Sequence, residues 1–309
     1  MKTKNKKTKK MEIKESVLDL VGNTPMIKLE KNLFAKIEKF NPGGSVKDRI
    51  AIRMIECAEK RKELTRDKVI IEPTSGNTGI GIAMAAAVKG YKAVIVMPES
   101  VSIERRKIIH AFGAEIILTL AEKGTDGAIE LVKKMTAENP DKYFFPNQFS
   151  NNCNVLAHYF GTGEEILRQT NGKIDIFVAG VGTGGTLMGV SKRLKEFNPK
   201  IKIIGVEPEF GHKIQGLKNM KESKVPKIFE RSKIDKTVMI SDEEAYETAR
   251  MIARKYGLLV GMSSGAAAYV AFGIAKENPR KKVVVFLPDG GERYLSTSLF
   301  GLPEDKENK

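Results

Sequence analysis

The chain has 309 residues, 41% of them hydrophobic, and a formal net charge of +15, so one large or two medium globular domains are expected. No apolar run is long enough to cross a bilayer, and residues 1–10 hold six lysines without the apolar stretch of a secretory signal, so we expect a disordered tail there. Lysine is mixed with glutamate along the whole chain without a nucleic-acid-binding module, which argues against a membrane or nucleic acid as a partner.

Strands and helices are expected to alternate along nearly the whole chain. The predicted strands are short apolar runs at 33–37, 69–71, 93–97, 115–120, 174–179, 201–206 and 283–287, with a strand and loop at 143–149. Helical patterns follow at 48–62, 80–89, 102–112, 124–139, 158–169, 187–197, 242–256 and 265–275, and 210–236 is the least regular stretch. Continuous apolar strands are typical of sheets covered on both faces. The pattern therefore predicts an α/β fold with parallel sheets, which bind ligands beyond the carboxyl ends of their strands.

The motif Asn41–Arg49 carries a lysine at the point where a strand gives way to a helix. Its proline and glycines make a tight turn, Ser45 is a candidate N-cap, and Asp48 suits the first helical turn. A lysine here would lie near the positive end of the helix dipole and beside Arg49, and both would lower the pKa of its ammonium group. Lys47 is therefore a candidate Schiff-base lysine, although most lysines of a basic protein are simply solvated.

The two cysteines, Cys57 and Cys153, form neither a disulfide framework nor a metal-ligand pattern. Cys57 falls within the helical pattern at 48–62, where we expect it to contribute to packing. This cysteine usage indicates a reducing, cytoplasmic location and no metal site.

A polar loop, Thr74–Thr78, follows the strand at 69–71 and precedes the helix at 80–89. Its three hydroxyls, its amide and its backbone N–H groups at a helix N-terminus suit a carboxylate or another anion. A helix cap alone would need only one such residue.

A glycine-rich loop, Gly180–Gly185, matches G-x-G-x-x-G between a strand and a helix, and Glu207 lies at the end of the next strand. This context is typical of dinucleotide sites, so an NAD-dependent oxidoreductase is one alternative. The loop itself predicts only that backbone amides hold a phosphate, to which Thr183 and Thr186 add hydroxyl donors. Two anion sites and a candidate imine lysine together suit pyridoxal phosphate carrying an amino acid.

With these motifs the chain resembles the cysteine synthase (O-acetylserine sulfhydrylase) family of fold-type II pyridoxal phosphate enzymes, which are related to cystathionine β-synthase. The resemblance runs from Val17 to Phe300 and rests on Val21–Pro25, Asn41–Arg49, Glu72–Gly79, Gly180–Thr186, Leu258–Gly265 and Gly291–Thr297. It implies a homodimer and a tryptophan synthase β-like fold of two three-layer αβα domains with mostly parallel sheets. The larger domain would comprise 11–45 and 150–309, and a smaller mobile domain would comprise 46–149.

The resemblance also implies a role for each residue that matches a family motif. Lys47 would hold the cofactor as a Schiff base and then remove the α-proton as general base. Asn77 would hydrogen-bond the ring hydroxyl of the cofactor, and Ser263 would face its pyridine nitrogen, which a neutral hydroxyl leaves unprotonated. The cofactor phosphate would be bound by Gly182, Thr183, Gly184, Gly185 and Thr186, and the substrate carboxylate by Thr74, Ser75, Gly76, Thr78 and Gln148.

The implied reaction is a β-replacement on a 3-substituted L-alanine. Either O-acetylserine and sulfide give cysteine and acetate, or cysteine and water give serine and hydrogen sulfide. A β-eliminating serine/threonine dehydratase, which would release pyruvate, is the other pyridoxal phosphate alternative. A non-catalytic binding protein would be expected to lack Lys47.

One part of the chain departs from the family pattern. His212–Gly216 is kept, but Leu217–Lys221 and a charged stretch up to Asp235 replace the small residues that usually follow. Because of this departure, the family's specificity for O-acetylserine cannot be assigned to this chain. The same holds for the docking of serine acetyltransferase. We hypothesise that Asp235, or else Glu230, reaches the site and activates water as nucleophile; the alternative is a surface charge before a strand. Asp289 lies in a further departing turn, to which no role is assigned.

Overall fold

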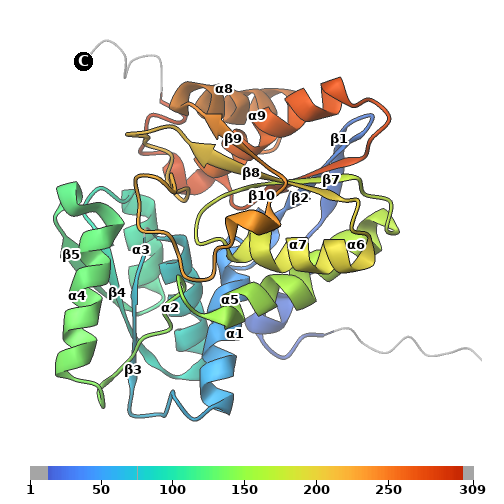
Figure 1. The fold of residues 1–309 in the computed structure, drawn as a ribbon. Helices are drawn as coiled ribbons and strands as arrows, with labels where there is room; N and C mark the ends of the chain where they lie inside the picture. The colour runs from blue at the N-terminus through green and yellow to red at the C-terminus, as the bar shows by residue number, and fades with distance from the viewer. Residues whose placement is uncertain (1–12, 75, 302–309) are drawn as a thin grey trace, which may run out of the picture.

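The computed structural model describes residues 13–74 and 76–301 and contains two sheets covered by helices (Figure 1). The strands are β1 (Met26–Glu30), β2 (Leu33–Ile37), β3 (Val69–Pro73), β4 (Lys92–Pro98), β5 (Glu115–Thr119), β6 (Tyr143–Phe144), β7 (Ile176–Gly180), β8 (Lys202–Pro208), β9 (Lys236–Ile240) and β10 (Val283–Leu287). The larger sheet has the strand order β1-β2-β10-β7-β8-β9, and the smaller sheet has the order β5-β4-β3-β6. Only β1 and β2 pair in antiparallel fashion among the described strands. The predicted α/β fold with two mostly parallel sheets is therefore confirmed.

The helices cover both faces of each sheet. They are α1 (Lys47–Lys60), α2 (Asn77–Lys89), α3 (Ile103–Ala111), α4 (Gly124–Glu138), α5 (Asn152–Ala157), α6 (Glu164–Thr170), α7 (Gly185–Phe197), α8 (Asp242–Tyr256) and α9 (Met262–Glu277). Figure 1 shows α8 and α9 on one side of the larger sheet and α6 and α7 on the other. None of the helices in the described part of the chain is both long enough and apolar enough to span a membrane.

Strand β10 illustrates why the strands are continuous apolar runs. Val283, Val285 and Leu287 pack in the core cluster that includes α8 and α9, whereas Val284 and Phe286 pack in the cluster that includes α7. Successive side chains of a strand point to opposite faces. Because β10 has a helical layer on each face, all five of its side chains are buried and apolar.

Several helix boundaries differ from the predictions, and two of the differences concern α1 and the helix before α6. Val46, not Ser45, is the N-cap of α1, although the Ser45 hydroxyl accepts a hydrogen bond from the Lys47 N–H (3.1 Å). The helix expected at 158–169 begins earlier, at Asn152, and passes through a π-helical turn at His158–Gly163 before it continues as α6. The predicted tail at 1–10 lies outside the described residues.

A disulfide between Cys57 and Cys153 joins α1 to α5, so the expectation of two unpaired cysteines is wrong. The partners are 96 residues apart in the chain, and they meet because Ile50 and Met54 of α1 pack together with Cys153 in one buried cluster. Sequence spacing alone does not reveal such a pairing. An oxidised pair also removes the cysteine usage as an argument for a reducing location.

Changing Cys57 to Ser is expected to lower the free energy of unfolding by about 2–4 kcal/mol, because a bond that closes a long loop restricts the unfolded chain. Denaturant unfolding would compare the oxidised protein, the same protein treated with dithiothreitol, and the variant. The reduced protein and Cys57→Ser should unfold alike. Equal stability of the oxidised and reduced protein would contradict the prediction.

A buried cluster of four charged side chains fixes the start of α1 against the larger sheet. Arg49 binds Glu38 (Nε–Oε2 2.5 Å) and Glu165 of α6 (Nη1–Oε1 2.6 Å), and Lys36 of β2 binds the other Glu165 oxygen (2.6 Å). These side chains are at most 7% exposed. Because removing one partner leaves an uncompensated buried charge, the cluster specifies the position of α1, whose first residue is Lys47.

Candidate active site

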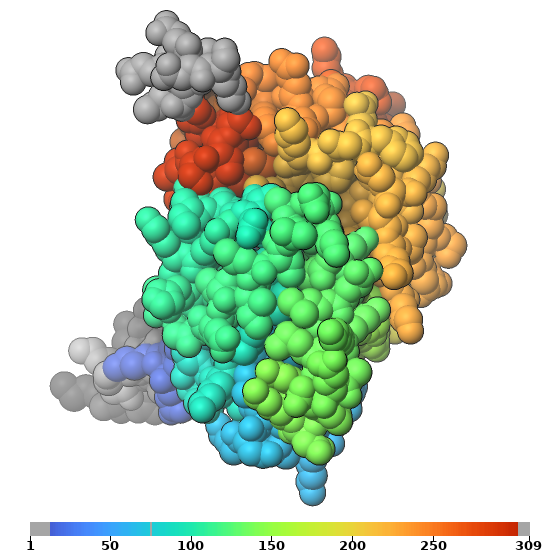
Figure 2. Space-filling model, turned by 90° about the vertical axis from the view of Figure 1, so that its left-hand side faces the viewer, coloured from blue at the N-terminus to red at the C-terminus, as the bar shows by residue number. Residues whose placement is uncertain are grey.

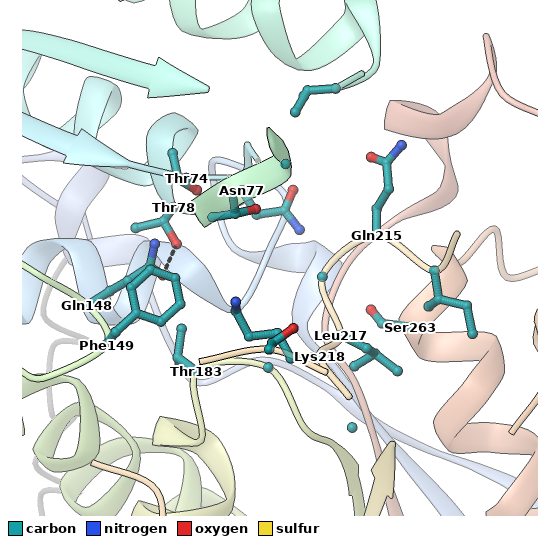
Figure 3. A pocket seen from close by; sticks show the side chains of 18 of the residues that line it. Thr74, Asn77, Thr78, Gln148, Phe149, Thr183, Gln215, Leu217, Lys218 and Ser263 are labelled. Carbon is teal, nitrogen blue, oxygen red and sulfur yellow. Dashed lines mark hydrogen bonds between the residues drawn. The ribbon is translucent and has the colours of Figure 1, made fainter. Parts of the chain in front are cut away.

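Most of the predicted site residues line one cavity of about 800 Å³ at the carboxyl ends of β3, β4, β7 and β10, although Gly76 and Gly185 are not among the lining residues. Figure 2 shows the face on which the green residues around the smaller sheet border the gold and orange residues that follow β8. Figure 3 shows side chains from both parts facing this cavity. Those that were predicted from the sequence and line it are Lys47, Thr74, Asn77, Thr78, Gln148, Gly182, Thr183, Gly184, Thr186 and Ser263.

Lys47 enters the cavity from the first position of α1. Burial lowers the pKa of its ammonium group; the negative charges of Asp289 and Glu38 act in the opposite direction, and the Arg105 charge adds to the lowering. Arg49 was expected to lower this pKa through its positive charge. It is instead paired with Glu38 and Glu165 in the buried cluster. The predicted direction is thus found, with burial as its main cause.

The turn before Lys47 is stabilised by Asp48. The Gly43 N–H donates to an Asp48 carboxylate oxygen (2.6 Å), and burial raises the pKa of Asp48 to about 7. Gly44 adopts a positive φ of 78°, which favours glycine. These contacts fix the chain that leads into α1.

The glycine-rich turn after β7 is shaped to hold an anion. A Cβ on Gly182 would come within 2.6 Å of the Gly216 carbonyl oxygen, and Gly184 has a φ of 88°, so both positions favour glycine. Gly184 is the N-cap of α7 and provides no side-chain cap, and the Gly185 N–H makes a long hydrogen bond to the Thr183 hydroxyl (3.4 Å), so the first turn of α7 can still donate to a ligand. The turn therefore fits a phosphate, and the Thr183 and Thr186 side chains lie beside it in the same cavity.

Two residues that sequence reasoning missed support this turn. The Asn154 amide donates to the Thr183 hydroxyl (3.1 Å), and His158 Nε2 lies 3.3 Å from the Thr186 hydroxyl. Burial and the charges of Arg49 and Lys47 lower the pKa of His158 well below its usual range, so its imidazole is neutral. Within a helical pattern neither residue carries a sequence signal, because it is the packing of α7 on this helix that buries them.

The carboxylate of Glu207 is occupied by protein groups. It accepts hydrogen bonds from the Met220 N–H (3.0 Å) and from the Arg231 guanidinium (2.6 Å). A ribose-binding role for Glu207, on which the dinucleotide alternative depended, is therefore not supported.

The Thr74–Thr78 loop and Gln148 come together at the cavity. The Thr78 hydroxyl donates to Gln148 Oε1 (2.7 Å), and the Gly76 N–H donates to the Thr74 hydroxyl (3.1 Å). Burial raises the pKa of Glu72 to about 8, and its carboxyl group accepts the Gln148 N–H (3.0 Å). The predicted loop partners are thus neighbours, while Ser75 lies outside the described residues.

Asp289, which had no assigned role, orients Asn77. The Asn77 amide donates to Asp289 Oδ2 (2.8 Å) and accepts a hydrogen bond from Arg293 (2.7 Å). The Tyr294 hydroxyl also donates to Asp289 Oδ2 (2.6 Å). Asn77 uses one of its two amide N–H groups in this network, which leaves the other to bind a ligand. Ser263, in the first turn of α9, faces the same cavity (Figure 3).

The hypothesis that Asp235 reaches the site is wrong. Its carboxylate binds Lys195 (2.8 Å), Lys202 (3.3 Å) and the Ile203 N–H (2.8 Å). It therefore lies at the amino ends of β8 and β9, the edge of the sheet opposite the cavity. Glu230 is also absent from the described lining, with an exposed side chain 3.9 Å from Lys233.

The chain was compared with known proteins. The model of the family described as pyridoxal-phosphate dependent enzyme matches residues 17–289. A cysteine synthase from Aquifex aeolicus is 46% identical over 302 residues, which cover 93% of this chain and 92% of that protein. The crystal structure of a hydrogen sulfide-producing enzyme from Fusobacterium nucleatum is 44% identical, with a TM-score of 0.87 and coverage of 92% of this chain and 100% of that one. The structure of a cysteine synthase from Entamoeba histolytica is 40% identical, with a TM-score of 0.89 and coverage of 97% and 95%.

Proposed function

Since this chain belongs to the pyridoxal-phosphate dependent enzyme family and is a β-replacement enzyme of the cysteine synthase type, we propose that it joins sulfide to a serine whose hydroxyl carries a leaving group. The observation that carries this proposal is the position of Lys47 in one cavity with the glycine-rich turn and the Thr74–Thr78 loop. The other β-replacement, in which cysteine and water give serine and hydrogen sulfide, loses its candidate water-activating carboxylate, Asp235. It stays a second candidate because the Fusobacterium nucleatum relative is a hydrogen sulfide-producing enzyme.

This proposal assigns a task to each predicted cofactor- and substrate-binding residue. Pyridoxal phosphate, when bound, supplies an electron-withdrawing ring that makes the α-proton of an amino acid removable. Asn77 would bind its ring hydroxyl and Ser263 its ring nitrogen. Its phosphate would be held by Gly182, Thr183, Gly184, Gly185 and Thr186, and the substrate carboxylate by Thr74, Ser75, Gly76, Thr78 and Gln148. The Lys47 amine, whose pKa is lowered by burial, would accept the α-proton and return it after sulfide has added.

A comparison of substrates tests the direction of the reaction. Cofactor-loaded enzyme with O-acetyl-L-serine and sulfide is expected to form L-cysteine faster than it releases sulfide from L-cysteine alone. Cysteine, serine and pyruvate would be separated and quantified. Pyruvate as the main product would favour the dehydratase, and faster sulfide release from cysteine would reverse the assignment.

We also infer that the smaller domain, predicted as 46–149, closes over the substrate when the carboxylate draws the Thr74–Thr78 loop inward. A homodimer stays a prediction from the resemblance, and light scattering on the purified protein tests it. A cytoplasmic location stays a prediction that was made from the cysteine usage. Docking of serine acetyltransferase is not expected, because Leu217–Lys221 departs from the family pattern.

A further inference from the structure

Besides Lys47, the cavity is lined by the exposed Lys123 and Lys213 and by the less exposed Lys218, which the proposed reaction does not use. Lys218 follows the buried Leu217, and its side chain lines the cavity with 14% of its surface exposed (Figure 3). The Lys218 N–H donates to the Val181 carbonyl (2.8 Å), and the Met220 N–H donates to Glu207 (3.0 Å). Lys218 is therefore held by its neighbours on a well-packed segment.

The ammonium group of Lys218 is poorly compensated. It lies 3.8 Å from Asp126 Oδ1 and 5.3 Å from the centre of the Phe149 ring. The Asp126 side chain is 50% exposed, so water screens this ion pair and its contribution is small. Burial lowers the pKa of Lys218, although Asp126 acts in the opposite direction. A mostly buried cation with a screened partner is suited to bind an anion.

The surroundings of Lys218 belong to the substrate side of the cavity. Phe149 follows Gln148, which is proposed to hold the substrate carboxylate, and Asp126 lies in the first turn of α4. This turn lines the cavity and has no side-chain cap, so its N–H groups add partial positive charge. The cofactor phosphate already has donors in the glycine-rich turn.

We propose that Lys218 binds an oxyanion on the β-substituent of the substrate, so that the enzyme prefers the phosphate monoester of serine to the acetyl ester. This inference rests on the proposed function. The Cβ–O bond breaks and its electron pair leaves with the phosphate, sulfide forms the Cβ–S bond, and the α-proton taken by Lys47 is returned. O-Phospho-L-serine and hydrogen sulfide thus give L-cysteine and inorganic phosphate. Lys218 offsets the charge that grows on the departing group.

The test measures kcat/KM of the cofactor-loaded enzyme for O-phospho-L-serine and O-acetyl-L-serine, each with sulfide. Lys218→Met is expected to lower the value for the phosphate ester by about 10- to 100-fold, the range of a hydrogen bond to a charged group, and to change the value for the acetyl ester by less than about 3-fold. Lys218→Arg should keep the preference for the phosphate ester. Lys213→Met, which removes an exposed lysine from the same cavity, should leave both values unchanged.

Two binding measurements complete the test without turnover. Calorimetric titration with inorganic phosphate should show binding to the cofactor-loaded protein and to Lys218→Arg, and no binding to Lys218→Met. Pyridoxal phosphate should bind the apoprotein of Lys218→Met as tightly as the unmodified apoprotein. Weaker cofactor binding together with equal losses for both esters would make Lys218 a cofactor ligand and overturn the proposal. Turnover of the acetyl ester alone would overturn only this inference, whereas turnover of neither ester would overturn the proposed function as well.

Discussion

Replacing Lys47 by alanine is expected to lower the rate of cysteine formation by at least about 10³-fold, because one amine both attaches the cofactor and moves the α-proton. Burial shifts this amine toward its neutral, nucleophilic form. Lys123, Lys213 and Lys218 also line the cavity, so the measurement must show which of the four amines holds the cofactor. The fold should be retained, since the ion cluster that fixes α1 involves Arg49 and not Lys47.

The measurement for Lys47 does not depend on activity alone. Borohydride reduction of the cofactor-loaded protein should fix the cofactor on the peptide that contains Lys47, as shown by mass spectrometry, and Lys47→Ala should carry no label. Lys60→Ala, at the other end of the same helix, is the matched control and should keep both label and rate. A label on another lysine of the unmodified protein would refute the assignment.

Replacing Glu165 by glutamine is expected to lower the free energy of unfolding by about 3–5 kcal/mol, because Arg49 and Lys36 then keep buried charges without their shared counter-ion. Glu165 binds both cations through separate oxygens, each at 2.6 Å. The adjacent Glu164 is the matched control. Its side chain is 44% exposed and binds only Arg193 among the described ion pairs. Glu164→Gln should therefore cost at most about 1 kcal/mol.

The pH dependence of unfolding provides a second measure of Glu165. Burial would raise the pKa of its carboxyl group, but the hydrogen bonds and charges of Arg49 and Lys36 outweigh burial and lower the pKa to about 2. A pKa depressed below the value of about 4.3 in the unfolded chain stabilises the protein above that pH, and this stability is lost as the pH falls toward 2. The difference between the unmodified protein and Glu165→Gln should shrink over this window. A difference that stays constant would contradict the assignment.

The sequence was most informative where strand pattern and loop chemistry coincide. The strands at 33–37 and 283–287 have the predicted bounds, because continuous apolar runs between helices leave few other structures. The predicted loops after β3 and β7 follow the carboxyl ends of strands in two different sheets, and both loops border the same cavity. The rule that parallel sheets bind ligands beyond the carboxyl ends of their strands also argues against Asp235, since a residue just before a parallel strand lies at the opposite edge.

The remaining features depend on contacts between distant segments. The Cys57–Cys153 disulfide and the ion cluster of Arg49 and Glu165 join residues that only helix packing brings together. Lys218 did carry a signal, because it stands where the family has small residues. The sequence did not show the burial of Lys218, which depends on how the loop that carries the buried Leu217 packs against the rest of the chain.

The two attachments of α1 have a mechanical consequence. The ion cluster fastens its beginning to β2 and α6, and the disulfide fastens its far end to α5. Because α1 is anchored at both ends, the smaller domain, predicted as 46–149, cannot rotate about residue 46. We therefore expect the pivot for closure to lie downstream of Lys60, so that the amine at position 47 stays stationary while the carboxylate-binding loop approaches it.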